Sequence, residues 1–249
     1  MTGIEFGGVH TSELGLALKT LQRSAGAEIR RKEVEIPGKD GVYSFPYKKR
    51  GNKTHIARLS YVVDDIYDAR QKERKIGAWL SPQDAILKFD DEPEIEYIAT
   101  AYSEIVPSED TTMREVAIEF ECQPFGLSRE KIFERYVSGN LQETVLYYGT
   151  EAVGLGSQQG AMFEIEIDGN FDSITLEMNT AQMAVNRPFE QSLIIIDNVN
   201  GSIVENGESV IKDVTFNKFL SLLPGSNLLE ISGTGLQCFV RLKYKELYV

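Results

Sequence analysis

The chain has 249 residues, of which 42% are hydrophobic and 26% are charged, a composition typical of a soluble globular protein. Acidic residues outnumber basic ones by 38 to 26, and the resulting net charge of -12 disfavours binding to nucleic acid phosphates and to anionic membranes. The first ten residues lack the pattern of a signal peptide, and no later stretch approaches the length of a membrane span, so we expect neither secretion nor membrane insertion.

In chain order, the first elements are two strands joined by a loop. Alternating leucines predict a strand over residues 13–20, with a loop over 21–28. The next strand carries Val34 and Ile36 between glutamates and is expected to bury that apolar face. Residues 37–41, with the sequence PGKDG, then reverse the chain, because proline removes a hydrogen-bond donor from the strand and glycine accepts positive φ.

A polar arm from Lys39 to Lys53 follows this turn and contains the basic run Lys48-Lys49-Arg50. Its simplest interpretation is the solvated part of a hairpin. It can also contact phosphate, or a protein surface, including an acidic surface on another copy of this acidic chain. The last interpretation is the first indication of assembly.

The first half contains one convincing helix, over residues 65–80. Asp64-Asp65 predict its N-terminus, because carboxylates accept the first free amide groups and complement the helix dipole. Trp79, at its end, is expected to be a packing anchor. The clearest strand alternates Val116, Ile118, Phe120 and Cys122 with charged residues and ends at Gln123-Pro124-Phe125-Gly126. That ending predicts a domain boundary and therefore two domains, 1–125 and 126–249.

The second half is a series of short strands separated by turn signals. Asn200-Gly201 and Asn206-Gly207 are strong hairpin turns, and the pattern predicts a β-sandwich or jelly roll. The fold class is therefore mainly β, with two domains. Cys122 and Cys238 lie at inward positions of alternating strands and are expected to be reduced core residues.

Few residues of the sequence suggest a catalytic or metal-binding site. The chain has two histidines and no HExxH, CxxC, phosphate-binding loop or nucleophile elbow. The acidic cluster Asp90-Asp91-Glu92, with Glu94 and Glu96, can in principle bind a hard cation, but a solvated turn is the simpler interpretation. We therefore nominate no catalytic residue, cofactor or metal ligand. A hydrolase of cell-wall polymer is the least supported class.

Several motifs, spread in order over nearly the whole chain, together resemble one known family. They are Phe6-Gly7-Gly8-Val9-His10-Thr11-Ser12, Leu14-Gly15-Leu16, Ile36-Pro37-Gly38-Lys39-Asp40-Gly41, Gly77-Ala78-Trp79-Leu80, Phe89-Asp90-Asp91-Glu92-Pro93, Phe120-Glu121-Cys122-Gln123-Pro124-Phe125 and Leu223-Pro224-Gly225-Ser226-Asn227. As a set, they are similar to the distal tail proteins (Dit) of long-tailed, siphovirus-type bacteriophages or prophages of Gram-positive bacteria.

The resemblance implies a belt domain over 1–125, a β-sandwich with one helix, and an outward-facing galectin-like jelly roll over 126–249. Six belts would form a ring around a channel for DNA, alone or as two stacked rings. This hub of the virion tail tip, assembled in the bacterial cytoplasm, would join the tail tube to a tail-associated lysin or fibre protein and to a receptor-binding protein. DNA would contact the ring only while it passes through the channel, and the resemblance implies no membrane partner.

Because we expect no enzyme activity, the functional residues should lie at interfaces with other subunits or proteins. On this interpretation the arm reaches a neighbouring subunit and the helix ending at Trp79 supports the belt. The candidate interface residues are Lys39, Asp40, Lys48, Lys49, Arg50, Lys53 and Trp79. The alternative is a carbohydrate-binding module that grips cell-wall saccharide, with the aromatic residues Tyr147, Tyr148 or Phe189 as stacking platforms. Against it, residues 126–249 contain no histidine and no tryptophan, and a shared fold does not confer sugar binding.

Overall fold

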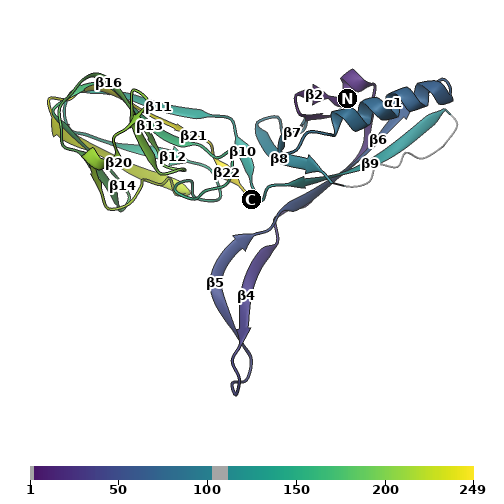
Figure 1. Ribbon diagram of the computed structural model, residues 1–249, viewed down its shortest axis with the longest axis horizontal. Coiled ribbons are helices and arrows are strands. Elements are labelled where there is room, and N and C mark those ends of the chain that lie inside the picture. Colours follow the sequence, from purple (N-terminus) through teal and green to yellow (C-terminus); the bar gives the residue numbers. More distant parts are fainter. Residues whose placement is uncertain (1–2, 103–111) are drawn as a thin grey trace. The chain divides into compact units, whose positions relative to one another are not determined.

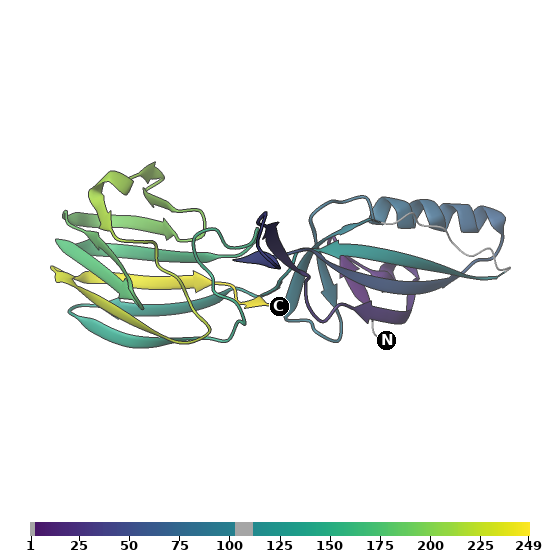
Figure 2. The same ribbon diagram turned by 90° about the horizontal axis from the view of Figure 1, so that it is seen from below.

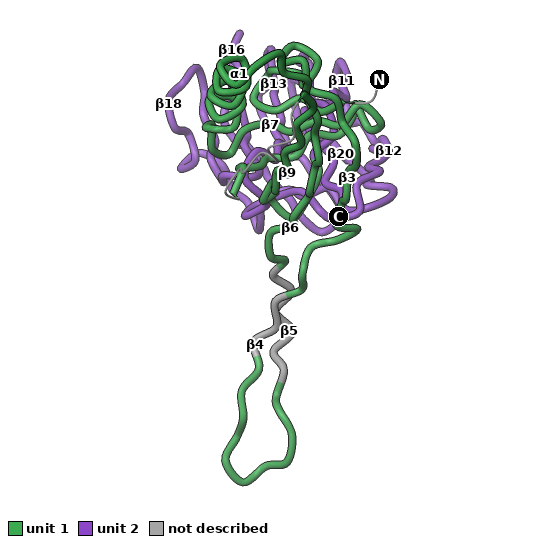
Figure 3. Tube along the Cα trace, turned by 90° about the vertical axis from the view of Figure 1, so that its right-hand side faces the viewer, with its two compact units in different colours: residues 1–126, 249 green, residues 127–248 purple. Residues whose placement is uncertain are grey.

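The computed structural model describes residues 3–102 and 112–249; the side chains of residues 30–32 and 44–49 lie outside this description. The chain divides into two compact units, residues 1–126 with 249 (unit 1) and residues 127–248 (unit 2), as Figure 3 shows. Among the described residues the structure is mainly β with a single α-helix (Figure 1), which confirms the predicted fold class.

Unit 1 is built on an antiparallel sheet whose strands pair in the order β2-β1-β7-β8-β9-β6-β3. These strands are β1 (Ile4–Phe6), β2 (Val9–His10), β3 (Ala17–Arg23), β6 (Lys53–Val62), β7 (Ala85–Phe89), β8 (Ile95–Ala101) and β9 (Met113–Cys122). β6 and β9 pair along their whole length. On β9, Val116, Ile118 and Phe120 are buried while the alternating glutamates point outward, as a strand with one covered face requires.

Helix α1 (Ile66–Trp79) packs on this sheet through Ala69, Ile76 and Trp79. Its predicted start is confirmed, because the side chain of Asp65 accepts a hydrogen bond from the amide of Asp68 at 2.8 Å.

The strand predicted over residues 13–20 is only partly correct. A short 3-10 helix, η1 (Thr11–Leu14), comes first, and β3 begins at Ala17 and continues to Arg23, into the predicted loop. His10 caps this helix through its side chain, and Gly15, at φ 68°, ends it in the left-handed conformation. The local capping interactions therefore override the leucine alternation.

β4 (Ile29–Glu35) and β5 (Val42–Arg50) form a two-stranded antiparallel sheet of their own, here called the hairpin. The predicted turn is confirmed, with Gly38 at φ 83° and Gly41 at φ 85°. β5 occupies most of the stretch that the sequence indicated as a polar arm.

Unit 2 contains a six-stranded sheet, β11-β21-β13-β16-β17-β18, and a five-stranded sheet, β12-β20-β14-β15-β19, seen from a second direction in Figure 2. The strands are β11 (Lys131–Val137), β12 (Leu141–Tyr147), β13 (Phe163–Phe171), β14 (Ser173–Met178), β15 (Ala181–Val185), β16 (Phe189–Asp197), β17 (Ser202–Glu205), β18 (Glu208–Ser209), β19 (Val214–Phe216), β20 (Gly225–Thr234) and β21 (Gln237–Tyr244). The short strands β10 (Gly126–Ser128) and β22 (Leu247–Tyr248) belong to neither sheet and pair with each other, and η2 (Ile211–Asp213) is a 3-10 helix. Alternate residues of both sheets, such as Ile165 and Ile231, are buried. Cys122 in unit 1 and Cys238 in unit 2 are free and buried, as predicted.

Candidate interaction surface

The hairpin carries large apolar side chains that stay exposed to solvent in the single chain. Val34 lies opposite Tyr43 in the antiparallel register, so both side chains occupy one face. The exposed apolar residues of the hairpin, each 40–53% accessible, are Ile29, Val34, Ile36, Val42 and Tyr43. The sequence predicted a buried face for Val34 and Ile36. That prediction is wrong for the single chain, because β4 pairs with β5 alone.

A two-stranded hairpin is marginally stable at best in water, and exposed apolar clusters mark interaction sites. The hairpin is also basic in an otherwise acidic chain. Residues 29–50 contain seven basic and three acidic side chains, a net charge of +4 in a chain whose total is -12. The hairpin therefore combines an apolar face with positive charge, and it suits an acidic, partly apolar partner surface.

The predicted interface residues are divided between this surface and the core. Lys39 and Asp40 are exposed in the turn of the hairpin. Arg50 ends β5, with its guanidinium carbon 5.7 Å from the centroid of the Phe125 ring. The side chains of Lys48 and Lys49 lie outside the described residues.

Lys53 and Trp79 require a correction, because both are buried in unit 1, at 4% and 7% exposure. The Lys53 ammonium lies 4.9 Å from the centroid of the Tyr97 ring, and burial lowers the pKa of this lysine. The Trp79 indole donates a hydrogen bond to the Phe6 carbonyl at 3.0 Å. Both side chains are therefore core residues of the single chain, and for Trp79 this confirms the predicted packing anchor.

Sequence reasoning missed the apolar members of the hairpin surface. It assigned the interface to charges, and it assigned Val34 to a core. No local signal could have found them, because strands also precede and follow the hairpin in sequence, and only the topology shows that β4 and β5 pair with each other alone.

The acidic cluster of the turn after β7 is engaged in ion pairs. Arg23 bridges Asp91 and Glu92, and Asp90 accepts hydrogen bonds from the Gly3 amide and the His10 ring. Across residues 3–102 and 112–249 we find no group of acidic, histidine or cysteine side chains arranged to hold a metal ion. Within the same ranges, no helix is long and apolar enough to cross a membrane.

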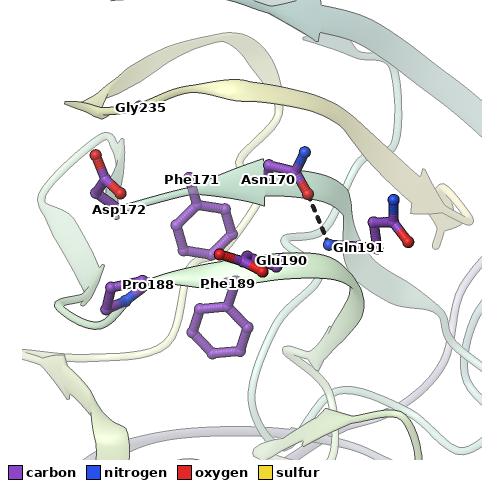
Figure 4. A pocket seen from close by; sticks show the side chains of 8 residues that line it. All are labelled: Asn170, Phe171, Asp172, Pro188, Phe189, Glu190, Gln191 and Gly235. Carbon is purple, nitrogen blue, oxygen red and sulfur yellow. Dashed lines mark hydrogen bonds between the residues drawn. The ribbon is translucent and has the colours of Figure 1, made fainter.

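Figure 4 shows a polar pocket of about 460 Å³ in unit 2, where Phe171 and Phe189 lie between Asn170, Asp172 and Glu190. The two rings stack on each other, with centroids 4.9 Å apart, and the guanidinium of Arg187 lies 4.4 Å from the centroid of the Phe189 ring. Phe189 therefore offers no free face to a sugar. Tyr147 is also buried. Of the three proposed stacking platforms, Tyr148 alone is exposed.

Comparison with known families places both units in phage tails. Residues 10–122 match the model of the phage tail protein RIFT-related domain, and residues 157–248 match the model of the C-terminal domain of the siphovirus-type tail component. The two matches define a component of a siphovirus-type tail. The chain belongs to the siphovirus distal tail protein family.

Among solved structures, the chain is similar to SPP1 Dit, described as a paradigm of the hub adsorption apparatus in phages that infect Gram-positive bacteria. The TM-score is 0.75 at 14% identity, over 98% of this chain and 99% of that chain. A chain of the phage p2 baseplate in its activated conformation aligns with a TM-score of 0.45 at 8% identity, over 99% and 98% of the two chains. No curated protein matches the chain.

Proposed function

We propose that the chain forms a homohexameric ring, single or stacked in pairs, that is the hub of the virion tail tip. The hub joins the tail tube to a tail-associated lysin or fibre protein and to a receptor-binding protein, and DNA passes through its central channel. Family membership and the hub description of SPP1 Dit support this role. It is structural and not enzymatic, and assembly takes place in the bacterial cytoplasm. The net charge of -12 suits a channel in which DNA slides without binding.

The observation that carries the proposal is the uncovered hairpin. A single chain leaves its apolar face in water, whereas a ring gives every hairpin a neighbouring subunit that can cover it. In this arrangement residues 1–125 are the ring-forming belt and residues 126–249 face outward.

The test is the mass of the purified full chain by light scattering, followed by negative-stain imaging. We expect a mass of six or twelve chains and a ring with a central hole. A variant in which a two-residue Asn-Gly turn replaces residues 32–46 should lose this assembly and keep its fold by circular dichroism. The control Glu208→Gln changes an exposed residue of unit 2 and should assemble normally.

A hairpin-shortened variant that still forms the hexamer would contradict the role of the hairpin. A wild-type chain that stays monomeric at every concentration, even when the tail tube protein is added, would contradict the ring itself.

Carbohydrate binding by unit 2 is the second candidate, favoured by the exposed ring of Tyr148, which has the Lys131 ammonium 5.3 Å from its centroid. Aromatic faces stack on sugar rings, and a neighbouring cation can hydrogen-bond their hydroxyl groups. A cell-wall glycan array probed with the full chain and with Tyr148→Ala tests this candidate. Binding that disappears in the variant supports it, and no binding by the wild-type chain rejects it.

A further inference from the structure

The end of unit 1 farthest along β6 from the hairpin carries a second exposed apolar surface. It is formed where β6 ends, where α1 begins and where β9 begins, a region visible at the right of Figure 1. We call it the end patch and define it as Val62, Ile66, Tyr67 and Met113, with exposures from 48% to 70%.

The end patch is a defined part of the fold. Val62 and Met113 are direct partners in the β6–β9 register. Lys72 fixes the helix over the end of β6, because its ammonium donates to the Val62 carbonyl at 2.8 Å and pairs with Asp68 at 2.9 Å. The amide of Asp64 in turn donates to the Asp68 carboxylate. Val62 and Met113 lie on the solvent face of the sheet, and Ile66 and Tyr67 are exposed on the first turn of α1, which covers the opposite face. The end patch therefore extends over both layers at one end of unit 1.

The end patch has exposed acidic side chains, whereas the hairpin is basic. Asp64 and Asp65 are exposed between Val62 and Ile66, and the exposed face of β9 continues from Met113 with Glu115. The hairpin has a net charge of +4 and also exposes apolar side chains. The two surfaces are therefore complementary in both polarity and charge, the property that selects one partner surface over another.

The topology determines how these two surfaces can meet. The hairpin leads into β6 at Lys53, and β6 ends at Val62. Ten residues of strand extend roughly 30 Å, so the surfaces lie at opposite ends of β6. Two complementary surfaces at different places on one subunit form a heterologous, head-to-tail contact between copies, which closes into a ring when the rotation allows.

We propose that the hairpin of one copy docks on the end patch of the next copy around the ring. Val34, Ile36 and Tyr43 cover Val62, Ile66, Tyr67 and Met113, while Lys39 faces Asp64, Asp65 and Glu115. This inference rests on the proposed ring and names the surface that receives the hairpin.

The first experiment compares Ile66→Ser/Tyr67→Ser with the control Ile86→Ser/Tyr102→Ser, which removes two exposed apolar side chains of unit 1 outside the end patch. Because all four residues are exposed, both variants should keep the thermal stability of the wild type. We expect the end-patch variant to raise the subunit concentration needed for half-assembly by roughly tenfold or more, and the control to leave it unchanged. An equal effect of both variants, or no effect of either, would overturn the proposal.

The second experiment is cross-linking between chains that carry Ile36→Cys and chains that carry Tyr67→Cys. Native Cys122 and Cys238 are fully buried, so a short bis-maleimide should leave them unmodified. Cross-linked dimers are expected only when the two variants are mixed, and Ile36→Cys mixed with Ile86→Cys should give none. Absence of cross-links in assembled rings would place the hairpin on another surface.

The hairpin-shortened variant separates this proposal from the proposed function. If shortening the hairpin abolishes the ring while the end-patch variant assembles as the wild type does, the docking surface proposed here is wrong and the ring stands. If the shortened variant assembles normally, the hairpin does not contribute to ring assembly.

Discussion

The imidazole of His55 packs edge-on against the phenol ring of Tyr97, with centroids 5.2 Å apart and planes at 79°. Phe89 contacts the same imidazole, with ring centroids 5.6 Å apart, and within the described residues neither ring nitrogen of His55 has a hydrogen-bond partner. Burial, together with the charges of Lys53 and Arg23, lowers the pKa of His55 from 6.5 to about 4. A buried imidazole in this environment stays neutral near pH 7.

Unit 1 is therefore expected to lose stability in mild acid. The unfolded chain binds a proton at His55 below pH 6.5, whereas the folded chain does so only near pH 4. Unit 1 therefore has its full unfolding free energy above pH 6.5. As the pH falls from 6.5 to 4, this free energy decreases by up to about 3 kcal/mol. Urea unfolding followed by the fluorescence of Trp79, the only tryptophan, measures it.

His55→Phe should flatten the pH dependence of the unfolding free energy between pH 6.5 and 4, because the phenyl ring fits an aromatic cluster and has no nitrogen to protonate. The control His10→Asn alters the other histidine, which is half-buried at the N-cap of η1, and should keep the acid sensitivity. An unchanged pH profile in His55→Phe would show that other groups cause the loss.

Trp79→Phe should destabilise unit 1 by roughly 2 kcal/mol, because it removes the hydrogen bond to the Phe6 carbonyl and part of the packing against the Phe6 ring. Calorimetry of the full chain measures this change, since the fluorescent reporter is absent. Lys75→Gln, at an exposed position of the same helix outside the end patch, should leave the melting temperature unchanged. Equal melting temperatures for Trp79→Phe and the wild type would show that the Trp79 indole contributes no stability beyond that of a phenyl ring.

Glu246→Gln should destabilise unit 2 by about 1–3 kcal/mol. The carboxylate of Glu246 is buried and accepts hydrogen bonds from Lys131 at 2.8 Å, the Tyr148 amide at 2.9 Å and the Tyr248 hydroxyl at 2.6 Å. Burial alone would raise its pKa, but these bonds outweigh burial and hold the pKa below its usual range. The stability that the ionised Glu246 carboxylate contributes is thus fully present above the usual pKa of a glutamate. It is lost as the pH falls from there through the lowered pKa of the folded chain.

Hydrogen exchange of β22 and β12 in the full chain reports the effect of Glu246→Gln at neutral pH. Glu208→Gln, in the exposed turn of β18, should leave exchange in both strands unchanged. If both variants exchange like the wild type, the buried carboxylate contributes no stability.

Gly169→Ala should cost at least about 2 kcal/mol more than Gly207→Ala. Both glycines have positive φ, at 139° and 91°. A methyl group on Gly169 would lie 2.5 Å from the Gln237 carbonyl oxygen and 2.8 Å from the Cys238 α-carbon, whereas one on Gly207 would have no atom within 4 Å. Thermal melts of the two variants give the difference, and similar melting temperatures would exclude a close approach at Gly169.

The PGKDG turn and the Asp65 cap were predictable because each depends on residues a few positions apart. The same holds for the inward and outward alternation of β9, where the strand period alone separates Val116 from the glutamates. The family resemblance is likewise carried by short motifs, each of them a run of neighbouring residues.

The tertiary structure alone decided which alternating strands bury their apolar faces. Val34 and Val116 have similar local patterns, yet Val116 is buried because its face of β9 packs in the core of unit 1, whereas Val34 is exposed because β4 lies in a separate two-stranded sheet outside that core. The same kind of nonlocal packing placed Lys53 in the core beside Tyr97, although its sequence neighbours are polar. The sequence thus determined turns, caps and strand periods, which depend on nearby residues. Burial, and with it the candidate interface, depends on distant segments meeting in space, and the tertiary structure decided it.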